Sequence, residues 1–219
     1  MDQSYEKLKL AMRYFLIGAY TATKDCSYSQ VLEVMEWSET IHDGMRKDGV
    51  TKEFMHQLGI AQHIRTLGPH LMNLTGTLSA AFLHDTSEDH TLAAAQIAER
   101  FGRVAADDSQ RMSKIRNGTK LPLDIYFDEL ADCPRCSIVK GADRVNNLQS
   151  MLGVFSLAKQ EEYIDEAEKW ILPMLKRARR NFPRQEAAYE NIKLMMVSQI
   201  ELLRANIASN RLVSSNPTT

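Results

Sequence analysis

The chain has little of what membrane-spanning and disulfide-stabilised proteins need. Its 219 residues include only 3 cysteines, 10 glycines and 6 prolines. Three cysteines are too few for a disulfide framework. The best apolar run, Tyr14 to Tyr20, is much shorter than the roughly 18 residues of a membrane-spanning helix, and it follows Arg13. We therefore expect neither a signal peptide nor a membrane span.

The chain also lacks an excess of charge of one sign. It has 27 Lys and Arg against 28 Asp and Glu, which gives a formal net charge of -1. A nearly neutral chain has no bulk attraction to nucleic acid or to an anionic membrane, so neither is expected as a partner. Its length is that of one domain with a substantial core. These properties predict a globular protein of the cytoplasm.

Helix-forming residues are plentiful, whereas strand patterns are nearly absent. Apolar residues recur at helical spacing along most of the chain. The sequence predicts one all-α domain with additional helices at both ends. Its parts are a core at about 30–155, an N-terminal helical extension at 1–29, C-terminal helices at 156–209 and a flexible tail at 210–219. Helices are expected over about 4–22, 27–41, 51–67, 71–84, 92–101, 103–116, 137–152, 158–180 and 184–209.

One helix cap and one irregular connection can also be predicted from the sequence. Thr51 is a plausible N-cap for the third helix. The segment 117–134, which contains Pro122 and Pro134, is expected to be irregular. The single pair Cys133 and Cys136 is therefore expected in a loop, and a zinc or redox role is the less favoured interpretation.

Ionisable side chains gather at the end of one apolar helical run. His84, Asp85, Glu88 and Asp89 lie within six residues. Burying such groups is costly unless something compensates, and a metal ion is the usual compensation. Spacings of four residues place candidate ligands and candidate acid/base groups on neighbouring patches of one helix end. On this stretch alone, a solvated acidic helix end is an equal alternative.

Two further residues favour the metal. His56 on the preceding helix and Asp143 on a later one complete a set of two imidazoles and two carboxylates. Such a mixed set suits Mn²⁺, Fe²⁺ or Zn²⁺ with positions left for water and substrate. Asn147 lies one turn beyond Asp143 and faces the same side. Arg46 and Lys47, on a turn ahead of His56, could meet an anionic ligand.

Other candidates have simpler interpretations. His63 is seven residues after His56, shares its helix face and is a rival ligand. His42 is expected to cap or to pack at a helix end. A basic cluster could bind nucleic acid but is more simply a solvated helix end that complements the helix dipole. It consists of Lys176, Arg177, Arg179, Arg180 and Arg184.

Three motifs carry a resemblance to a known family. They are Arg46-Lys47-x-Gly49, His84-Asp85-x-x-Glu88-Asp89 and Lys140-x-Ala142-Asp143-Arg144-x-x-Asn147. With His56, they resemble the HD superfamily of metal phosphohydrolases. More narrowly, they are similar to the hydrolase domain of RelA/SpoT-type enzymes and to the small alarmone hydrolases, including the metazoan SpoT homologue. The resemblance spans about residues 38–152 and implies an HD-domain helical bundle.

The resemblance also implies a role for each matching residue. Glu88 and Asp89 would orient or activate the attacking water and handle protons at the leaving phosphate. One Mn²⁺, with Fe²⁺ or Zn²⁺ as alternatives, would be held by His56, His84, Asp85 and Asp143. The nucleotide would be bound by Arg46, Lys47, Lys114, Arg144 and Asn147.

The implied reaction is removal of the 3′-pyrophosphate from (p)ppGpp, which yields GDP or GTP and pyrophosphate. Where the family has an aromatic-rich segment around its first ligand, this chain has Lys52 to Gln57 with acidic Glu53. Another nucleotide therefore stays an alternative: an adenosine analogue of the alarmone, NADPH or a dNTP. So does a non-catalytic alarmone-binding or antitoxin-like module. The terminal helices could form a lid, simple packing or a dimer surface, which leaves a homo-oligomer open.

Overall fold

The computed structural model describes residues 3–89, 94–116 and 118–215, with the side chains of residues 88, 89 and 213–215 outside the description. Most of the described chain is helical, and its one sheet is a two-stranded antiparallel hairpin, which confirms the all-α prediction. No helix among these residues has both the length and the apolar character that crossing a membrane requires.

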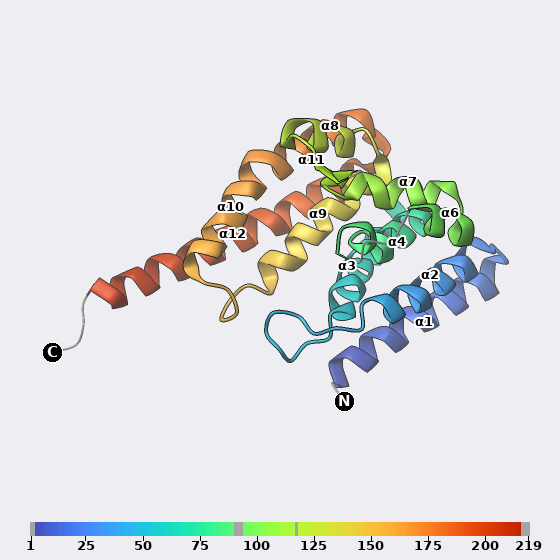
Figure 1. The fold of residues 1–219 in the computed structure, drawn as a ribbon, viewed down its shortest axis with the longest axis horizontal. Helices are drawn as coiled ribbons and strands as arrows, with labels where there is room; N and C mark the ends of the chain where they lie inside the picture. Colours follow the sequence, from blue (N-terminus) through green and yellow to red (C-terminus); the bar gives the residue numbers. More distant parts are fainter. Residues whose placement is uncertain (1–2, 90–93, 117, 216–219) are drawn as a thin grey trace.

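Most helices follow one another with short connections, and the exception is the long loop of residues 42–53 between α2 and α3 (Figure 1). The α-helices are α1 Gln3–Thr23, α2 Ser27–Ile41, α3 Phe54–Thr66, α4 Leu74–Leu83, α5 Thr86–Asp89, α6 Ala94–Phe101, α7 Arg103–Met112, α8 Leu123–Ala131, α9 Pro134–Gln149, α10 Leu157–Glu166, α11 Leu172–Asn181 and α12 Glu186–Ser215. The remaining elements are 3₁₀ turns η1 Gly68–His70 and η3 Pro183–Gln185, π-helical turn η2 Ala167–Ile171, and strands β1 Ile115–Arg116 and β2 Thr119–Lys120.

Helix α9 is the central element of the core. It packs against α3, α4, α7, α8, α11 and α12. Ten of its sixteen residues are buried, among them the polar Asp143 and Arg144. A helix that is covered on most sides must be apolar or must pair its charges internally. The charged residues of α9 therefore mark a built polar site within the core.

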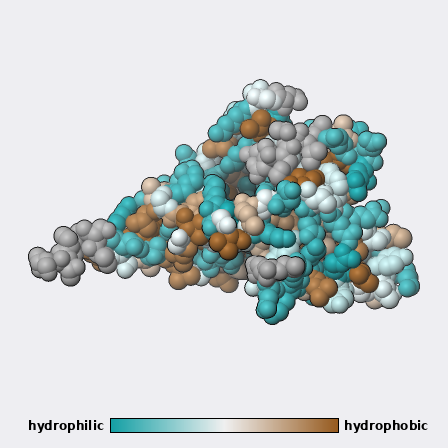
Figure 2. Space-filling view, turned by 60° about the horizontal axis from the view of Figure 1, so that its bottom comes forward, coloured by the Kyte–Doolittle hydropathy of each residue, from teal (hydrophilic) through white to brown (hydrophobic). Residues whose placement is uncertain are grey.

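The terminal helices pack on this core from two sides. Helix α1 buries Tyr5, Met12 and Leu16 against α2 and α3. Helix α12 packs along α9, and its last turns project away from the body (Figure 1). It continues to Ser215, so residues 210–215 are helical where the sequence predicts a flexible tail. On the face drawn in Figure 2, hydrophobic residues are scattered among hydrophilic ones.

Two expected helix boundaries are wrong, each for a local reason. Helix α3 begins at Phe54 because Thr51 does not cap it; the Thr51 hydroxyl instead donates to Asp48 at 2.6 Å within the preceding turn. Helix α7 ends at Met112, and the hairpin of β1 and β2 follows, turning at Gly118 with φ +75°. Ser113 takes an extended backbone, and its hydroxyl accepts the backbone N–H of Ile115 at 3.1 Å, so the helix stops at Met112.

The segment 117–134 also contains more helix than expected. Residues 123–131 form α8 directly after Pro122, and α9 begins at Pro134. Proline suits the first turn of a helix, since the amide hydrogen that it lacks has no helical partner there. Cys133 is consequently the N-cap residue of α9 and does not lie in an irregular loop.

Candidate metal centre and pocket

The turn between α4 and α5 carries His84 and Asp85. It is fixed by hydrogen bonds to the last carbonyl groups of α4, which a helix end leaves without a helical partner. Ser38 Oγ donates to the Phe82 carbonyl at 2.6 Å, and Ser109 Oγ donates to the Leu83 carbonyl at 3.1 Å. The apolar residues of α4 are buried up to Leu83. The two ionisable side chains therefore leave a rigid, buried support.

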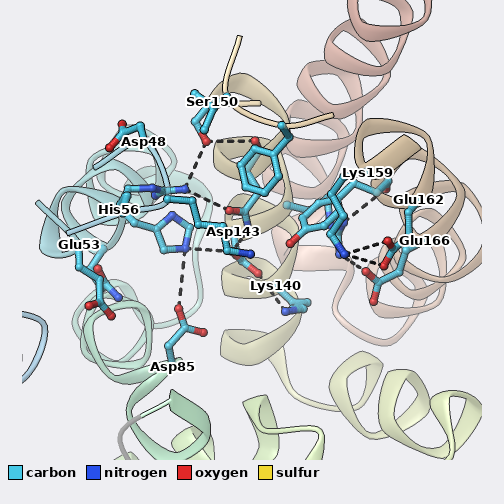
Figure 3. Close-up of a pocket in the computed structure, with 18 of the residues that line it drawn as sticks. Asp48, Glu53, His56, Asp85, Lys140, Asp143, Ser150, Lys159, Glu162 and Glu166 are labelled. Atoms are coloured by element: carbon cyan, nitrogen blue, oxygen red, sulfur yellow. Dashed lines mark hydrogen bonds and ion pairs between the residues drawn. The ribbon is translucent and has the colours of Figure 1, made fainter. Parts of the chain in front are cut away.

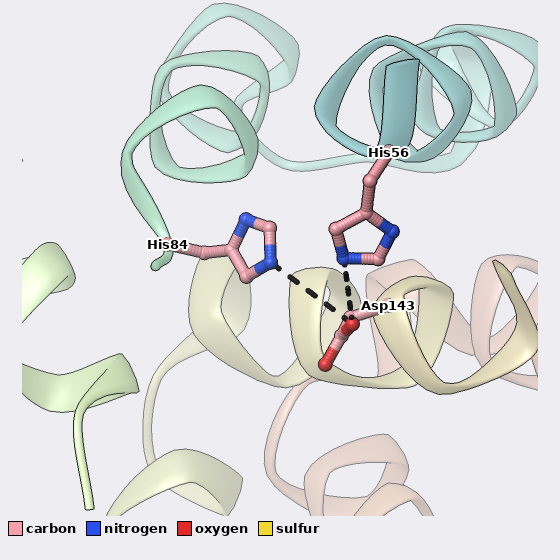
Figure 4. A group of neighbouring side chains, drawn as sticks. All are labelled: His56, His84 and Asp143. Carbon is pink, nitrogen blue, oxygen red and sulfur yellow. Dashed lines mark ion pairs between the residues drawn. The ribbon is translucent and has the colours of Figure 1, made fainter. Parts of the chain in front are cut away.

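Four side chains converge from α3, from this turn and from α9, and Figure 4 shows three of them, His56, His84 and Asp143. His56 Nε2 lies 3.2 Å from Asp143 Oδ1 and 3.9 Å from Asp85 Oδ2. His84 Nε2 lies 2.8 Å from Asp85 Oδ2 and 4.0 Å from Asp143 Oδ1. The structure thus brings together the four residues that the sequence proposes as metal ligands.

Hydrogen bonds on the far side of each ring orient the two imidazoles. His56 Nδ1 lies 2.7 Å from Asn146 Oδ1, and His84 Nδ1 lies 2.8 Å from the Ala81 carbonyl oxygen. Both partners are acceptors, so each Nδ1 carries a hydrogen and each Nε2 is directed at the cluster. This arrangement, with the second ring nitrogen anchored to an oxygen, is usual for histidines that bind metals.

The cluster is strongly coupled electrostatically. Burial opposes the charged form of His84, but Asp85 and Asp143 outweigh it and raise the pKa of His84 to about 9. Burial alone would raise the pKa of Asp143. The Lys140 ammonium, 2.9 Å from Asp143 Oδ2, and the two imidazoles instead hold that pKa well below its usual value. The carboxylates are therefore ionised at neutral pH, as metal ligands must be.

The donor set fits a divalent metal ion. One ligand atom each from His56, His84 and Asp143 lies within 4.8 Å of the others, and all three residues are buried. Among the described residues, none forms a well-aligned hydrogen bond with His84 Nε2. Nitrogen and oxygen ligands about 2.1 Å from an ion lie about 3 Å apart when adjacent. Imidazole and carboxylate together suit Mn²⁺, Fe²⁺ or Zn²⁺.

The cluster forms one end of a cavity of about 500 Å³, a volume typical of small-molecule sites (Figure 3). Of the residues that the structure describes, equal numbers of cationic and acidic side chains line its walls. The cations are Arg46, Lys47, Lys114, Lys140, Arg144 and Lys159. The carboxylates are Asp48, Glu53, Asp85, Asp143, Glu162 and Glu166.

Three proposed substrate residues lie on the rim next to the cluster. Arg46 Nη2 lies 3.5 Å from Asn147 Oδ1 and 3.3 Å from Ser150 Oγ. Asn147 Nδ2 donates to Asp143 Oδ1 at 2.6 Å, so it also contacts a proposed ligand. The Lys47 ammonium lies 5.3 Å from the centre of the Phe155 ring. Arg46 and Lys47 are thus held at the pocket mouth by weak contacts that an anion can replace.

Lys114 and Arg144 share a partner on α10. Lys114 Nζ lies 2.6 Å from Glu166 Oε1, and Arg144 forms an ion pair with Glu166 Oε2. Burial opposes ionisation of Glu166, but these cations lower its pKa to about 2. Arg144 is only 4% exposed and also donates to the Tyr163 carbonyl at 3.4 Å. This group joins α9 to α10 and forms the wall opposite the cluster.

Several pocket residues are not among those predicted from the sequence, although one of them, Lys140, has a usable signal. Lys140 lies within a recognised motif and is three residues before Asp143, a spacing that predicts contact on a helix. Asn146 is next to a singled-out asparagine but carries no signal of its own. Phe155 lies in the loop after α9, and Tyr163 and Glu166 lie on α10. They reach the pocket only through the tertiary structure, which no local pattern reveals.

The remaining candidate residues from the sequence lie in or outside the site as follows. Glu88 and Asp89 belong to α5, but their side chains lie outside the described residues. His63 Nε2 lies 3.1 Å from Asn191 Oδ1 on α12, so His63 does not join the cluster. His42 is buried at the end of α2, 3.0 Å from Glu53 Oε1, which agrees with a packing role. Within the basic cluster, Arg177 and Arg179 form ion pairs with acidic neighbours.

Comparison with known proteins adds a distant relationship. No family model matches the chain. Two proteins of Oryza sativa subsp. japonica, "Probable GTP diphosphokinase RSH3, chloroplastic" and "Probable GTP diphosphokinase RSH2, chloroplastic", are each 26% identical to it over 179 residues. The match covers 75% of this chain and 24% of each relative, so the chain spans about a quarter of their length. The similarity is to RelA/SpoT homologues as a group of nucleotide enzymes.

Proposed function

We propose that this chain is a Mn²⁺-dependent phosphohydrolase that removes the 3′-pyrophosphate of (p)ppGpp and releases GDP or GTP with pyrophosphate. The observation that carries the proposal is the convergence of His56, His84, Asp85 and Asp143 at one end of a nucleotide-sized cavity. The distant similarity to proteins named GTP diphosphokinases supports a guanine nucleotide as the substrate class.

The proposed roles follow from where each group lies. His56, His84, Asp85 and Asp143 would hold the ion, which when bound supplies a water of lowered pKa and offsets phosphate charge. Glu88 and Asp89, on the turn that follows, are proposed to accept the proton of that water and to return one to the leaving phosphate. Lys140 and Arg46 flank the cluster and would bind the anionic groups of the nucleotide.

A second candidate is the same chemistry on another nucleotide. It is favoured by Glu53, whose carboxylate lines the pocket and lies 3.0 Å from His42 Nδ1. A carboxylate accepts hydrogen bonds from amino groups and repels phosphates, so its position on the wall selects among bases. NADPH, a dNTP or an adenosine alarmone would then replace (p)ppGpp.

Product analysis tests the proposal directly. The protein is incubated with ppGpp and Mn²⁺, and the products are separated by anion-exchange chromatography. GDP and pyrophosphate are expected from the wild type. Glu88→Ala is expected to bind Mn²⁺ without turnover, whereas Asp85→Ala should lose both. Turnover retained in Glu88→Ala would remove that residue from the mechanism.

Other outcomes separate the alternatives. Intact ppGpp together with cleavage of NADPH, a dNTP or an adenosine alarmone would replace the first candidate by the second. Binding of ppGpp without cleavage of any nucleotide in this panel would identify a non-catalytic binding module.

A further inference from the structure

A second group of ionisable side chains lies in the core, away from the pocket. It consists of Cys133 and Cys136 at the start of α9 and Asp108 on α7. Their two sulfur atoms and one carboxylate oxygen lie within 4.8 Å of one another, and all three residues are buried. The proposed function uses none of these residues.

The two cysteines are placed as a reactive pair. Cys133 is the N-cap of α9, and its sulfur accepts the backbone N–H of Cys136 at 3.4 Å. Backbone N–H groups and the helix dipole at this end stabilise a thiolate. The hydrogen bond from the Cys136 thiol is the largest of the effects that lower the pKa of Cys133 to about 7. Cys133 is thus the nucleophile and Cys136 the thiol next to it.

Asp108 contacts both sulfur atoms. Its Oδ1 lies 3.6 Å from Cys133 Sγ and 3.5 Å from Cys136 Sγ. Arg135 holds the carboxylate in place, with Nε 2.5 Å from Oδ2 and Nη2 3.0 Å from Oδ1. A fixed, buried carboxylate beside the second thiol can receive its proton.

The same three residues are poorly suited to hold zinc. A structural zinc site needs four ligands, usually thiolates and imidazoles. Here the described residues supply two sulfur atoms and one carboxylate, and Arg135 already binds both oxygens of that carboxylate. A dithiol that can be oxidised explains the arrangement better than a metal site.

We propose that Cys133 and Cys136 are a peroxide-reactive dithiol that closes to a reversible disulfide. The Cys133 thiolate attacks one oxygen of a hydroperoxide, the O–O bond breaks, and Cys133 becomes a sulfenic acid as hydroxide or alkoxide leaves. Cys136 then passes its proton to Asp108 and attacks Cys133 Sγ. The S–S bond forms, the S–O bond breaks, and the departing hydroxide takes the proton as water.

Burial selects the size of the oxidant. Cys133 is 5% exposed and Cys136 is fully buried, whereas Cys26, the third cysteine, is exposed. Of the pair, Cys133 alone has exposed area, and that area suits a small peroxide better than the in-line approach of a bulky disulfide such as oxidised glutathione. Oxidation by peroxide should therefore be much faster than thiol exchange with oxidised glutathione.

Mass spectrometry of the Cys26→Ser protein tests the pair without any assay of activity. After treatment with one equivalent of hydrogen peroxide, the protein should be lighter by two hydrogen atoms and recover on addition of dithiothreitol. Trypsin cleaves between Arg135 and Cys136. The oxidised protein should thus yield peptides 121–135 and 136–140 joined by a disulfide, and the reduced protein should yield them apart.

Variants of Cys133, Cys136 and Asp108 test the separate steps of this oxidation. In the same background, Cys136→Ser should stop at a Cys133 sulfenic acid, which dimedone traps when the treated protein is unfolded in its presence. Cys133→Ser should give no trapped product. Asp108→Asn should slow closure. Two thiols that still alkylate fully after peroxide, or a sulfinic acid without linked peptides, would overturn the proposal. Co-purification of one zinc ion that both cysteine variants lose would also overturn it.

Discussion

Asn146 Oδ1 accepts the Nδ1 hydrogen of His56 at 2.7 Å, across the contact between α9 and α3. The bond fixes which nitrogen of His56 faces the cluster. It depends on a glycine, because Gly59, one turn after His56, stands where a side chain would meet Asn146. Asn146 is therefore a support for the metal centre, although it is not a ligand.

Replacing this support should weaken metal binding. We expect Asn146→Ala to lower Mn²⁺ affinity by about 10–100-fold, the usual effect of losing a hydrogen-bond partner behind a metal-binding histidine. Isothermal titration with Mn²⁺ measures the change. Asn146→Asp retains an acceptor oxygen and should lose much less; equal losses in both variants would exclude the hydrogen bond as the cause.

A methyl group at Gly59 should act through the same bond. A Cβ there would lie 2.5 Å from Asn146 Nδ2, so Asn146 must move away from His56. Gly59→Ala is expected to weaken Mn²⁺ binding by about tenfold. It should also cost stability, although alanine favours a helix by about 1 kcal/mol over glycine.

The control for this substitution lies on α1. A Cβ at Gly18 would have no neighbour within 4 Å. Gly18→Ala should therefore raise the free energy of unfolding, measured in urea with chelator, by up to about 1 kcal/mol and leave Mn²⁺ binding unchanged. A stabilising Gly59→Ala would contradict the close contact.

Metal binding should stabilise the folded chain. At a Mn²⁺ concentration 100 times its dissociation constant, the gain is about 2.7 kcal/mol, provided that the unfolded chain binds none. For a chain of this size, that corresponds to a rise in Tm of about 5–10 °C. Differential scanning calorimetry with Mn²⁺ and with EDTA measures it. Asp85→Ala should abolish the rise, while Arg46→Ala should retain it.

Arg46 should act on substrate binding alone. Its guanidinium is held by contacts of 3.5 and 3.3 Å to Asn147 and Ser150, so it is available to a phosphate. A charge-assisted hydrogen bond contributes about 1.5–3 kcal/mol, and Arg46→Ala is expected to raise KM at least tenfold. Arg13→Ala, on α1 and paired with Glu36, should leave the kinetics unchanged. A Mn²⁺ affinity that falls along with KM would contradict this separation.

Glu166 should make stability depend on pH. Its pKa in the folded chain, about 2, is below the ordinary 4.5, so the ionised form is stabilised by folding. This contribution is complete above pH 4.5 and is lost as the pH falls toward 2. Glu166→Gln should cost about 3 kcal/mol at neutral pH, partly because Arg144 keeps a buried charge without its partner.

Urea denaturation between pH 2 and pH 7 measures this effect, with the wild type and Glu166→Gln converging at the acid end. Glu162→Gln is the matched control, since Glu162 lies on the same helix and its side chain is 66% exposed. It should change the unfolding free energy by less than about 1 kcal/mol. A difference between wild type and Glu166→Gln that persists at pH 2 would reject the pairing.

How much of this site can be read from the sequence depends on how local its signals are. Asp143 and Asn147 are one helical turn apart, so spacing alone puts them on one side of α9. His84 and Asp85 are adjacent in the chain, so their closeness needs no tertiary structure. The supports are different. Asn146 reaches His56 only because α9 crosses α3 at Gly59, and Glu166 reaches Arg144 only through the packing of α10.

The fold likewise has features that local sequence predicts and features that it does not. The helical class follows from periodicity, which is a property of each segment. The first residues of α3 and α9, near Thr51 and Pro134, depend on which hydrogen bond a neighbouring side chain makes. The Thr51 hydroxyl donates to Asp48, three residues earlier, and so does not cap α3. Cys133 Sγ accepts the backbone N–H of Cys136, three residues later, and so caps α9. Competing hydrogen bonds of similar strength decide such positions, and pattern alone does not rank them.

Among the described residues, six cations and six carboxylates line the cavity, and the proposed function adds the carboxylates of Glu88 and Asp89 to this site. A site with an excess of carboxylates repels a polyanion, so an unloaded chain would capture nucleotides slowly. A divalent ion offsets that excess, and removing the repulsion speeds the capture of anions in a salt-sensitive way. Metal would then bind first and nucleotide second, and the ion would act as the gate for capture as well as for chemistry.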